Sequence, residues 1–126
     1  GATLFTIANG PIAVLELLAY CTSNENSGGA APTLQWSHAP TDGAAATFSG
    51  ASASVASAVA GTTVVLQGTA LTTAPPVTIN GPVLGQTREI ILMAGVITST
   101  VAVGPSTALF QHHIRYRPLT PTAVVS

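Results

Sequence analysis

FQHHIRYRP, residues 110–118, is the most regular stretch of this chain. Residues two apart share a face of a β-strand, so its apolar and aromatic side chains gather on one side and its polar ones on the other. The first face holds Phe110, His112, Ile114 and Tyr116, and the second holds Gln111, His113, Arg115 and Arg117. Pro118 lacks an N–H group and is expected to end the strand. This period of two predicts a β-strand with one face toward a core.

Outward from this strand, the chain is cut into short pieces by 12 glycines and 9 prolines. The pieces are rich in Val, Ile and Thr, which favour strands. Besides 110–117, the expected strands are 3–8, 11–20, 33–38, 62–69, 77–79, 89–93 and 95–103. About eight short strands at this spacing predict one all-β domain over residues 1–126, an antiparallel β-sandwich or barrel that is jelly-roll-like.

Three segments leave alternatives open. Residues 11–20 are apolar on both faces except for Glu16, which favours a central strand covered on both sides over a buried helix. Residues 44–60 are rich in Ala and Ser and poor in large side chains, so they are expected to form a low-complexity loop, a loose β segment or a short helix over 52–60. Residues 118–126 are expected to form a C-terminal arm that pairs at a sheet edge or reaches a neighbouring subunit.

Charge is scarce. Only 6% of the residues are charged, against roughly 25% in an ordinary soluble domain. Lysine is absent, and the net charge is −1. Nucleic acid is therefore not an expected partner, because nothing here could neutralise several phosphates. Nor is a membrane, because the longest apolar stretches are well under the ~20 residues that cross a bilayer. No basic segment leads into an apolar one at the start, so no signal peptide is expected.

Residues with catalytic chemistry are present but form no signature, so no enzyme and no cofactor are predicted. A Gly-x-Ser-x-Gly elbow is missing, and Asp42 lies in a Pro-Thr-Asp-Gly segment typical of a turn. His112 and His113 point to opposite faces of a strand, so only one could enter a given metal site, and no metal is predicted. Cys21 is the single cysteine and is expected to be a small buried strand residue.

Two stretches carry a resemblance: LFTIANGPIAVLELLAYCTS at 4–23 and ALFQHHIRYRPLTPTAVV at 108–125. Their pattern of a Leu-Phe-Thr strand, a Gly-Pro turn and a closing Tyr-basic-Pro-Leu segment resembles small capsid decoration (cement) and minor head proteins of tailed bacteriophages. In this chain the pattern departs from the family in the 44–60 tract and in the lack of lysine. The resemblance implies a virion protein on the outer surface of the capsid that stabilises the shell, made in the cytoplasm of a bacterial host. It implies binding to the major capsid protein, as a homotrimer.

A surface poor in charge agrees with this, because little desolvation opposes contact with neighbours. The residues expected in the core or at a subunit or capsid interface are Phe5, Trp36, Phe110, Ile114, Arg115, Tyr116 and Arg117. The two arginines would supply polar contacts at the rim. The alternative is a head fibre, spike or tail component that recognises a host surface. A carbohydrate-binding module is a weaker option, because aromatic residues make up 5% of the chain.

Overall fold

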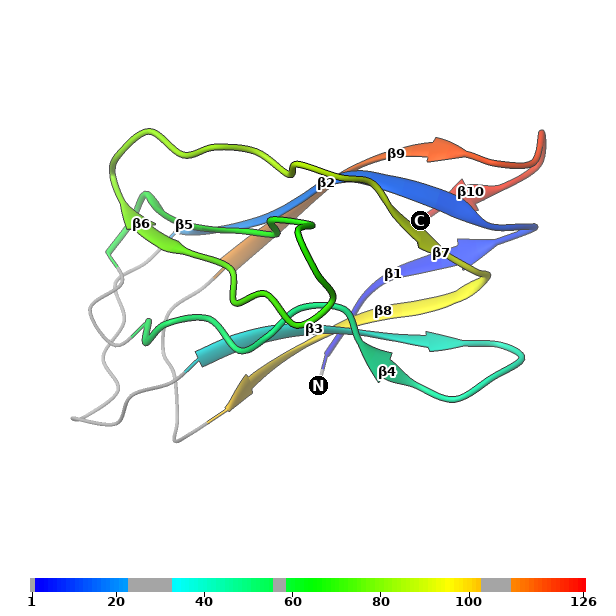
Figure 1. The fold of residues 1–126 in the computed structure, drawn as a ribbon, viewed down its shortest axis with the longest axis horizontal. Helices are drawn as coiled ribbons and strands as arrows, with labels where there is room; N and C mark the ends of the chain where they lie inside the picture. Colours follow the sequence, from blue (N-terminus) through cyan, green and yellow to red (C-terminus); the bar gives the residue numbers. More distant parts are fainter. Residues whose placement is uncertain (1, 23–32, 56–58, 103–109) are drawn as a thin grey trace.

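The computed structural model describes residues 2–22, 33–55, 59–102 and 110–126, and they form two antiparallel sheets (Figure 1). Sheet A has the strand order β10-β1-β8-β3-β4. Sheet B has the order β6-β5-β2-β7, with β9 on the other side of β2. The strands are β1 (Ala2–Ala8), β2 (Ile12–Cys21), β3 (Thr33–Pro40), β4 (Ala46–Thr47), β5 (Thr62–Val65), β6 (Val77–Ile79), β7 (Ile90–Leu92), β8 (Gly95–Ala102), β9 (Phe110–Pro118) and β10 (Val124–Val125).

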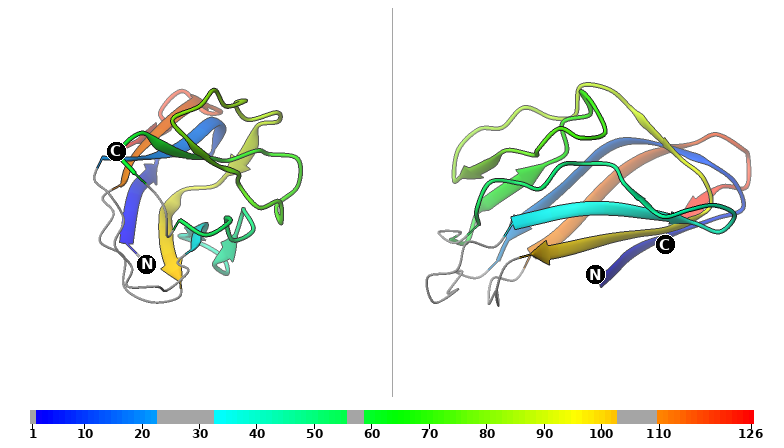
Figure 2. Two further views of the ribbon diagram at one scale, coloured as in Figure 1. Left: turned by 90° about the vertical axis from the view of Figure 1, so that its left-hand side faces the viewer. Right: turned by 60° about the horizontal axis from the view of Figure 1, so that its bottom comes forward.

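The two sheets lie face to face as an open sandwich and do not close into a barrel (Figure 2). The all-β antiparallel prediction is confirmed, with ten strands in the described part of the chain instead of about eight. The two further strands, β4 and β10, have two residues each, and β10 lies in the segment that was expected to pair at a sheet edge or reach a neighbouring subunit. No helix long and apolar enough to cross a membrane occurs in the described ranges.

Consecutive strands often change sheet. β1 and β2 are joined by Asn9, Gly10 and Pro11, the first two with φ of 66° and 136°, yet they lie in different sheets. Asn and Gly are the residues that tolerate positive φ at a sharp turn. The expected strand-turn-strand start is therefore correct, but its strands do not pair as a hairpin.

The core lies between the sheets and is centred on Trp36, which is completely buried. Along β3, Leu34, Trp36 and His38 face it, as the alternation predicted. Of the strands in sheet B, β2 contributes the most core residues: Ile12, Val14, Leu17, Ala19 and Cys21.

The inward residues of β2 change phase because of a β-bulge, where the register with β9 shifts between Val14 and Glu16. Strict alternation from Ile12 and Val14 would place Leu18 on their face, but Leu17 takes that side instead. The prediction of a strand is confirmed, and the buried helix is wrong. The expected cover on both sides is incomplete, because Tyr20 on the outer face is 38% exposed.

Part of the Ala/Ser-rich tract packs more tightly than its composition predicted. Phe48 and Val55 belong to the core, and the serines Ser49 and Ser52 are buried. Both hydroxyls accept hydrogen bonds from the backbone of β3, at 3.1 Å from Trp36 N and 2.9 Å from Leu34 N. Residues 44–55 include β4 and contain no helix, and residues 56–58 of the proposed helix lie outside the described residues.

The C-terminal segment folds back on its own chain. β10 pairs with β1, placing Val125 beside Ile7 and Val124 beside Ala8. Thr6 and Ser126 exchange two backbone hydrogen bonds of 2.8 and 2.9 Å. Of the two alternatives for residues 118–126, the structure shows pairing at a sheet edge.

Candidate interaction surface

The exposed face of β9 carries polar side chains that mostly pair with neighbours in sheet B. The hydroxyl of Tyr20 donates to the side-chain oxygen of Gln111. Glu16 lies 3.7 Å from Nε2 of His113, and the carboxylate of Glu89 lies 2.7 Å from a guanidinium nitrogen of Arg117. These contacts tie β9 to β2 and to the segment before β7.

Arg115 is different, because it makes no ion pair with any described residue. In the pairing of β9 with β2, Arg115 lies opposite Glu16, but the carboxylate of Glu16 pairs with His113 instead. Arg115 is exposed. A charged side chain is therefore available on this face for a partner.

The other face of β9 looks into the sandwich. Phe110, Ile114 and Tyr116 are half-buried and pack against the core. The hydroxyl of Tyr116 accepts a 3.3 Å hydrogen bond from the backbone N–H of Val125. The predicted alternation of this strand is confirmed residue by residue.

His112 completes that inner face and touches the opposite sheet. Its Nδ1 lies 3.4 Å from Nε1 of Trp36, and the two rings meet edge to face at 81°. Burial removes water from the imidazole and lowers its pKa to about 4. His113, with 58% of its side chain exposed, points the other way, as predicted for neighbours on a strand.

The predicted interface residues separate into three groups. Trp36 has no exposed surface in the single chain and lies in the core, one of the two places expected for it. Phe5, Phe110, Ile114 and Tyr116 are partly buried against the core and keep some surface. Arg115 and Arg117 are exposed, and Arg117 is already paired with Glu89.

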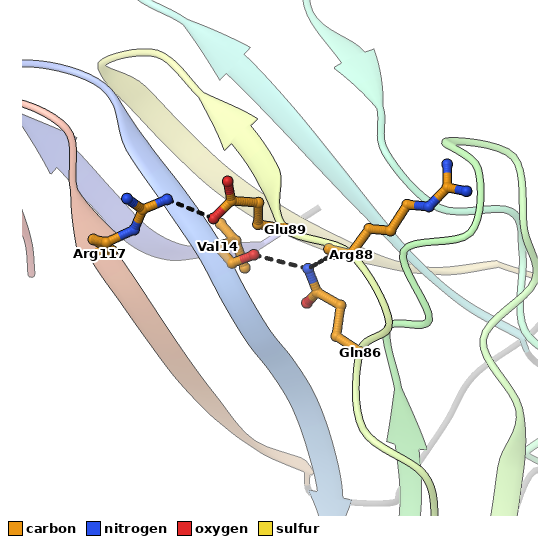
Figure 3. A network of polar contacts seen from close by, with 5 residues as sticks. All are labelled: Val14, Gln86, Arg88, Glu89 and Arg117. Carbon is orange, nitrogen blue, oxygen red and sulfur yellow. Dashed lines mark hydrogen bonds and ion pairs between the residues drawn. The ribbon is translucent and has the colours of Figure 1, made fainter.

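A polar network closes a gap beside β2 (Figure 3). β7 pairs with the start of β2 and β5 with its end, leaving the bulge between them without a strand partner on that side. The side-chain nitrogen of Gln86 fills the gap by donating to the carbonyl oxygens of Val14, at 2.8 Å, and Arg88, at 2.6 Å. Figure 3 shows the guanidinium of Arg88 pointing away from the Glu89–Arg117 pair.

Sheet A differs from sheet B in charge. None of its five strands contains Asp, Glu or Arg. Its outer face consists of small polar and apolar side chains at the positions that alternate with the core residues of β3 and β8, including Gln35, Ser37, Ala39, Val96 and Thr98. Sequence reasoning missed this face, although alternation around Trp36 and Ile97 was the signal that could have found it.

Two shallow hollows lie elsewhere on the surface. One, of about 370 Å³, lies at the turns that end the sandwich and is lined by Gly10, Pro11, Pro40, Thr41, Asp42, Met93 and Ala94. The other, of about 280 Å³, lies between residues 68–71 and the start of β7 and includes Arg88 and the exposed Leu71 and Ile91. No cluster of three His, Cys, Asp or Glu side chains suited to a metal occurs within the parts of the chain that the structure describes.

Comparison of the chain with models of protein families, with curated proteins and with solved structures finds no match.

Proposed function

We propose that this chain is a structural protein of a bacteriophage particle that binds the outside of the capsid as a homotrimer and stabilises the shell. The observation that carries the proposal is the uncharged sheet A. Burying such a face against a neighbour removes no ionised group from water, so the opposing desolvation cost is small. A sheet of this kind is suited to permanent contact.

Exposed apolar side chains support the same proposal. Large hydrophobic residues with at least 38% of their surface exposed in the single chain include Tyr20, Leu71, Ile79, Val83, Leu84, Ile91, Met93, Leu119 and Val124. Leu84 is 82% exposed. Scattered exposed hydrophobics are common, but here few charges accompany them, so contact between copies meets little repulsion.

The two sheets differ in charge, and this difference suggests which sheet contacts another copy of the chain and which contacts a different protein. The outer face of sheet A, centred on Ser37 and Thr98, suits contact between copies of the chain. Arg115, Arg117 and Glu16 lie on the outer face of sheet B, where charged groups suit a polar contact with a different protein. The resemblance of residues 4–23 and 108–125 to phage decoration proteins implies that this other protein is the major capsid protein of the shell.

The test uses capsids that lack this protein. Purified chain is added to them, and sedimentation with the particles and their heat resistance are measured. We expect co-sedimentation that saturates and a higher temperature of shell disruption. Mass measurement of the free chain should show three copies. Binding to host cells or glycans without binding to capsids would instead support a fibre, spike or tail component.

A further inference from the structure

Backbone groups along one side of β9 have no strand partner. Among the described strands, β9 pairs with β2 alone, over all nine of its residues. Its other long edge is therefore an edge of sheet B. Such an edge presents a row of N–H and C=O groups that can pair with another strand.

Hydrogen bonds on the far side of β2 identify which residues of β9 face that edge. In the register, Leu17 lies opposite Ile114 and Cys21 opposite Phe110. The carbonyls of Leu17 and Cys21 accept hydrogen bonds from the backbone N–H groups of Leu66, at 2.9 Å, and Gly61, at 2.8 Å, so they point away from β9. Residues opposite each other in an antiparallel pair either both face each other or both face away. The backbone groups of Ile114 and Phe110 therefore point away from β2.

At the other end, the N–H of Leu119 donates to Pro11 at 3.0 Å, toward β2. Backbone groups point to alternate sides along a strand. The N–H and C=O groups of Phe110, His112, Ile114 and Tyr116 therefore point to the open edge.

The side chains of the same residues strengthen the site. Phe110, Ile114 and Tyr116 are only partly buried, so apolar surface remains along the row whose backbone is open. An added strand would satisfy the backbone groups and cover apolar surface at the same time. Strand addition of this kind obtains affinity from the main chain and specificity from alternate side chains.

Charge on the outer face selects the partner. Gln111 and His113 already have partners on β2, Arg117 has one in the segment before β7, and Arg115 has no ion pair among the described residues. A side chain directly across from Arg115 on an added strand would lie within reach of its guanidinium. An acidic residue at that place would be stabilised.

We infer that the open edge of β9 is a docking site for an extended segment of a partner protein that carries an acidic side chain facing Arg115. This deepens the proposed function and rests on it for the partner, which would be the shell protein. A second copy of β9 fits less well. Antiparallel self-pairing with full overlap is centred on Ile114 and places Arg115 across from the other copy's His113 and diagonal to its Arg115, with no acid to meet them.

The test uses the isolated chain and two capped nine-residue peptides of alternating Thr and Val. One carries a central Glu and the other a central Lys. Amide chemical shifts and amide hydrogen exchange are followed by NMR during titration. The probe needs no capsid, so its result stands apart from that of the capsid experiment.

We expect the Glu peptide to slow exchange at His112, Ile114 and Tyr116 and to bind about fivefold more tightly than the Lys peptide. Arg115→Glu should reverse the preference. Arg88→Glu makes the same charge change at the other arginine without an ion pair among described residues and should leave the preference unchanged. Equal binding of both peptides, no binding at millimolar concentration, protection at another edge, or pairing of β9 with a second copy would each overturn the inference.

Discussion

Nε1 of Trp36 in sheet A lies 3.4 Å from Nδ1 of His112 in sheet B, and the ring centroids are 6.3 Å apart. The indole can only donate, so the imidazole accepts at Nδ1 and its neutral form carries the proton on Nε2. This polar contact between the sheets lies in the core and joins the centre of β3 to β9. The protonation state of His112 therefore affects the stability of the fold.

Stability should fall on acidification because of His112. In the unfolded chain this group takes up a proton near pH 6.5, but in the fold only near pH 4, because burial disfavours the charged ring. Between these values the unfolded state binds more protons, so the free energy of unfolding falls as pH drops from about 6.5 to 4 and is unaffected by this group above that range. The full effect is about 3 kcal/mol. Urea unfolding at several pH values measures it.

His112→Gln should remove this part of the pH dependence. His113→Gln, at the exposed neighbour, is the matched control and should keep it. Identical pH profiles for His112→Gln and the unaltered chain would contradict the assignment.

Gln86→Leu should destabilise the fold by about 1–3 kcal/mol, because the carbonyls of Val14 and Arg88 lose their donor beside the bulge. Chemical unfolding gives the difference. Gln111→Leu is the control, since that side chain is exposed and its hydrogen-bond partner is the hydroxyl of Tyr20. Equal losses for both variants would mean that the gap in sheet B does not need Gln86.

Gly95→Ala should cost about 2 kcal/mol or more. A Cβ at Gly95 would lie 2.2 Å from the carbonyl oxygen of Ala39 and 2.6 Å from Cα of Pro40, and backbone atoms cannot move aside without shifting β3. In Gly85→Ala the nearest atom would be Glu16 Oε2 at an ordinary 3.6 Å, so this control should be nearly neutral. Thermal unfolding of the two variants measures the loss of stability in each. Similar melting temperatures for both would contradict the close packing of β3 on β8.

Thr98→Lys should weaken the proposed trimer. Thr98 lies on the uncharged outer face of sheet A beside Ser37, and a lysine there would have to lose its water in a subunit contact. Light scattering across a dilution series should show dissociation at concentrations where the unaltered chain stays trimeric. Gln111→Lys places the same charge on sheet B and should leave the trimer intact. A trimer that resists Thr98→Lys would exclude this face as the contact.

The sequence alone determined the strand class, the two faces of β9 and the opposite directions of His112 and His113, and it left Trp36 as a core or interface residue. These features follow from local periodicity, because side chains of a strand alternate wherever the strand ends up. The scarcity of charge also needed no structure, whereas the absence of Asp, Glu and Arg from the strands of sheet A required knowing which strands form that sheet.

Tertiary structure alone decided the rest. A bulge shifted the inward residues of β2 from Leu18 to Leu17, since one extra residue reverses the alternation. Ser49 and Ser52 became buried because β3 offered them two backbone N–H groups. The pairing of Arg117 with Glu89, and the lack of an ion pair for Arg115 among the described residues, depend on how segments far apart in the chain meet. Periodicity describes one strand at a time, whereas these contacts depend on which strands become neighbours.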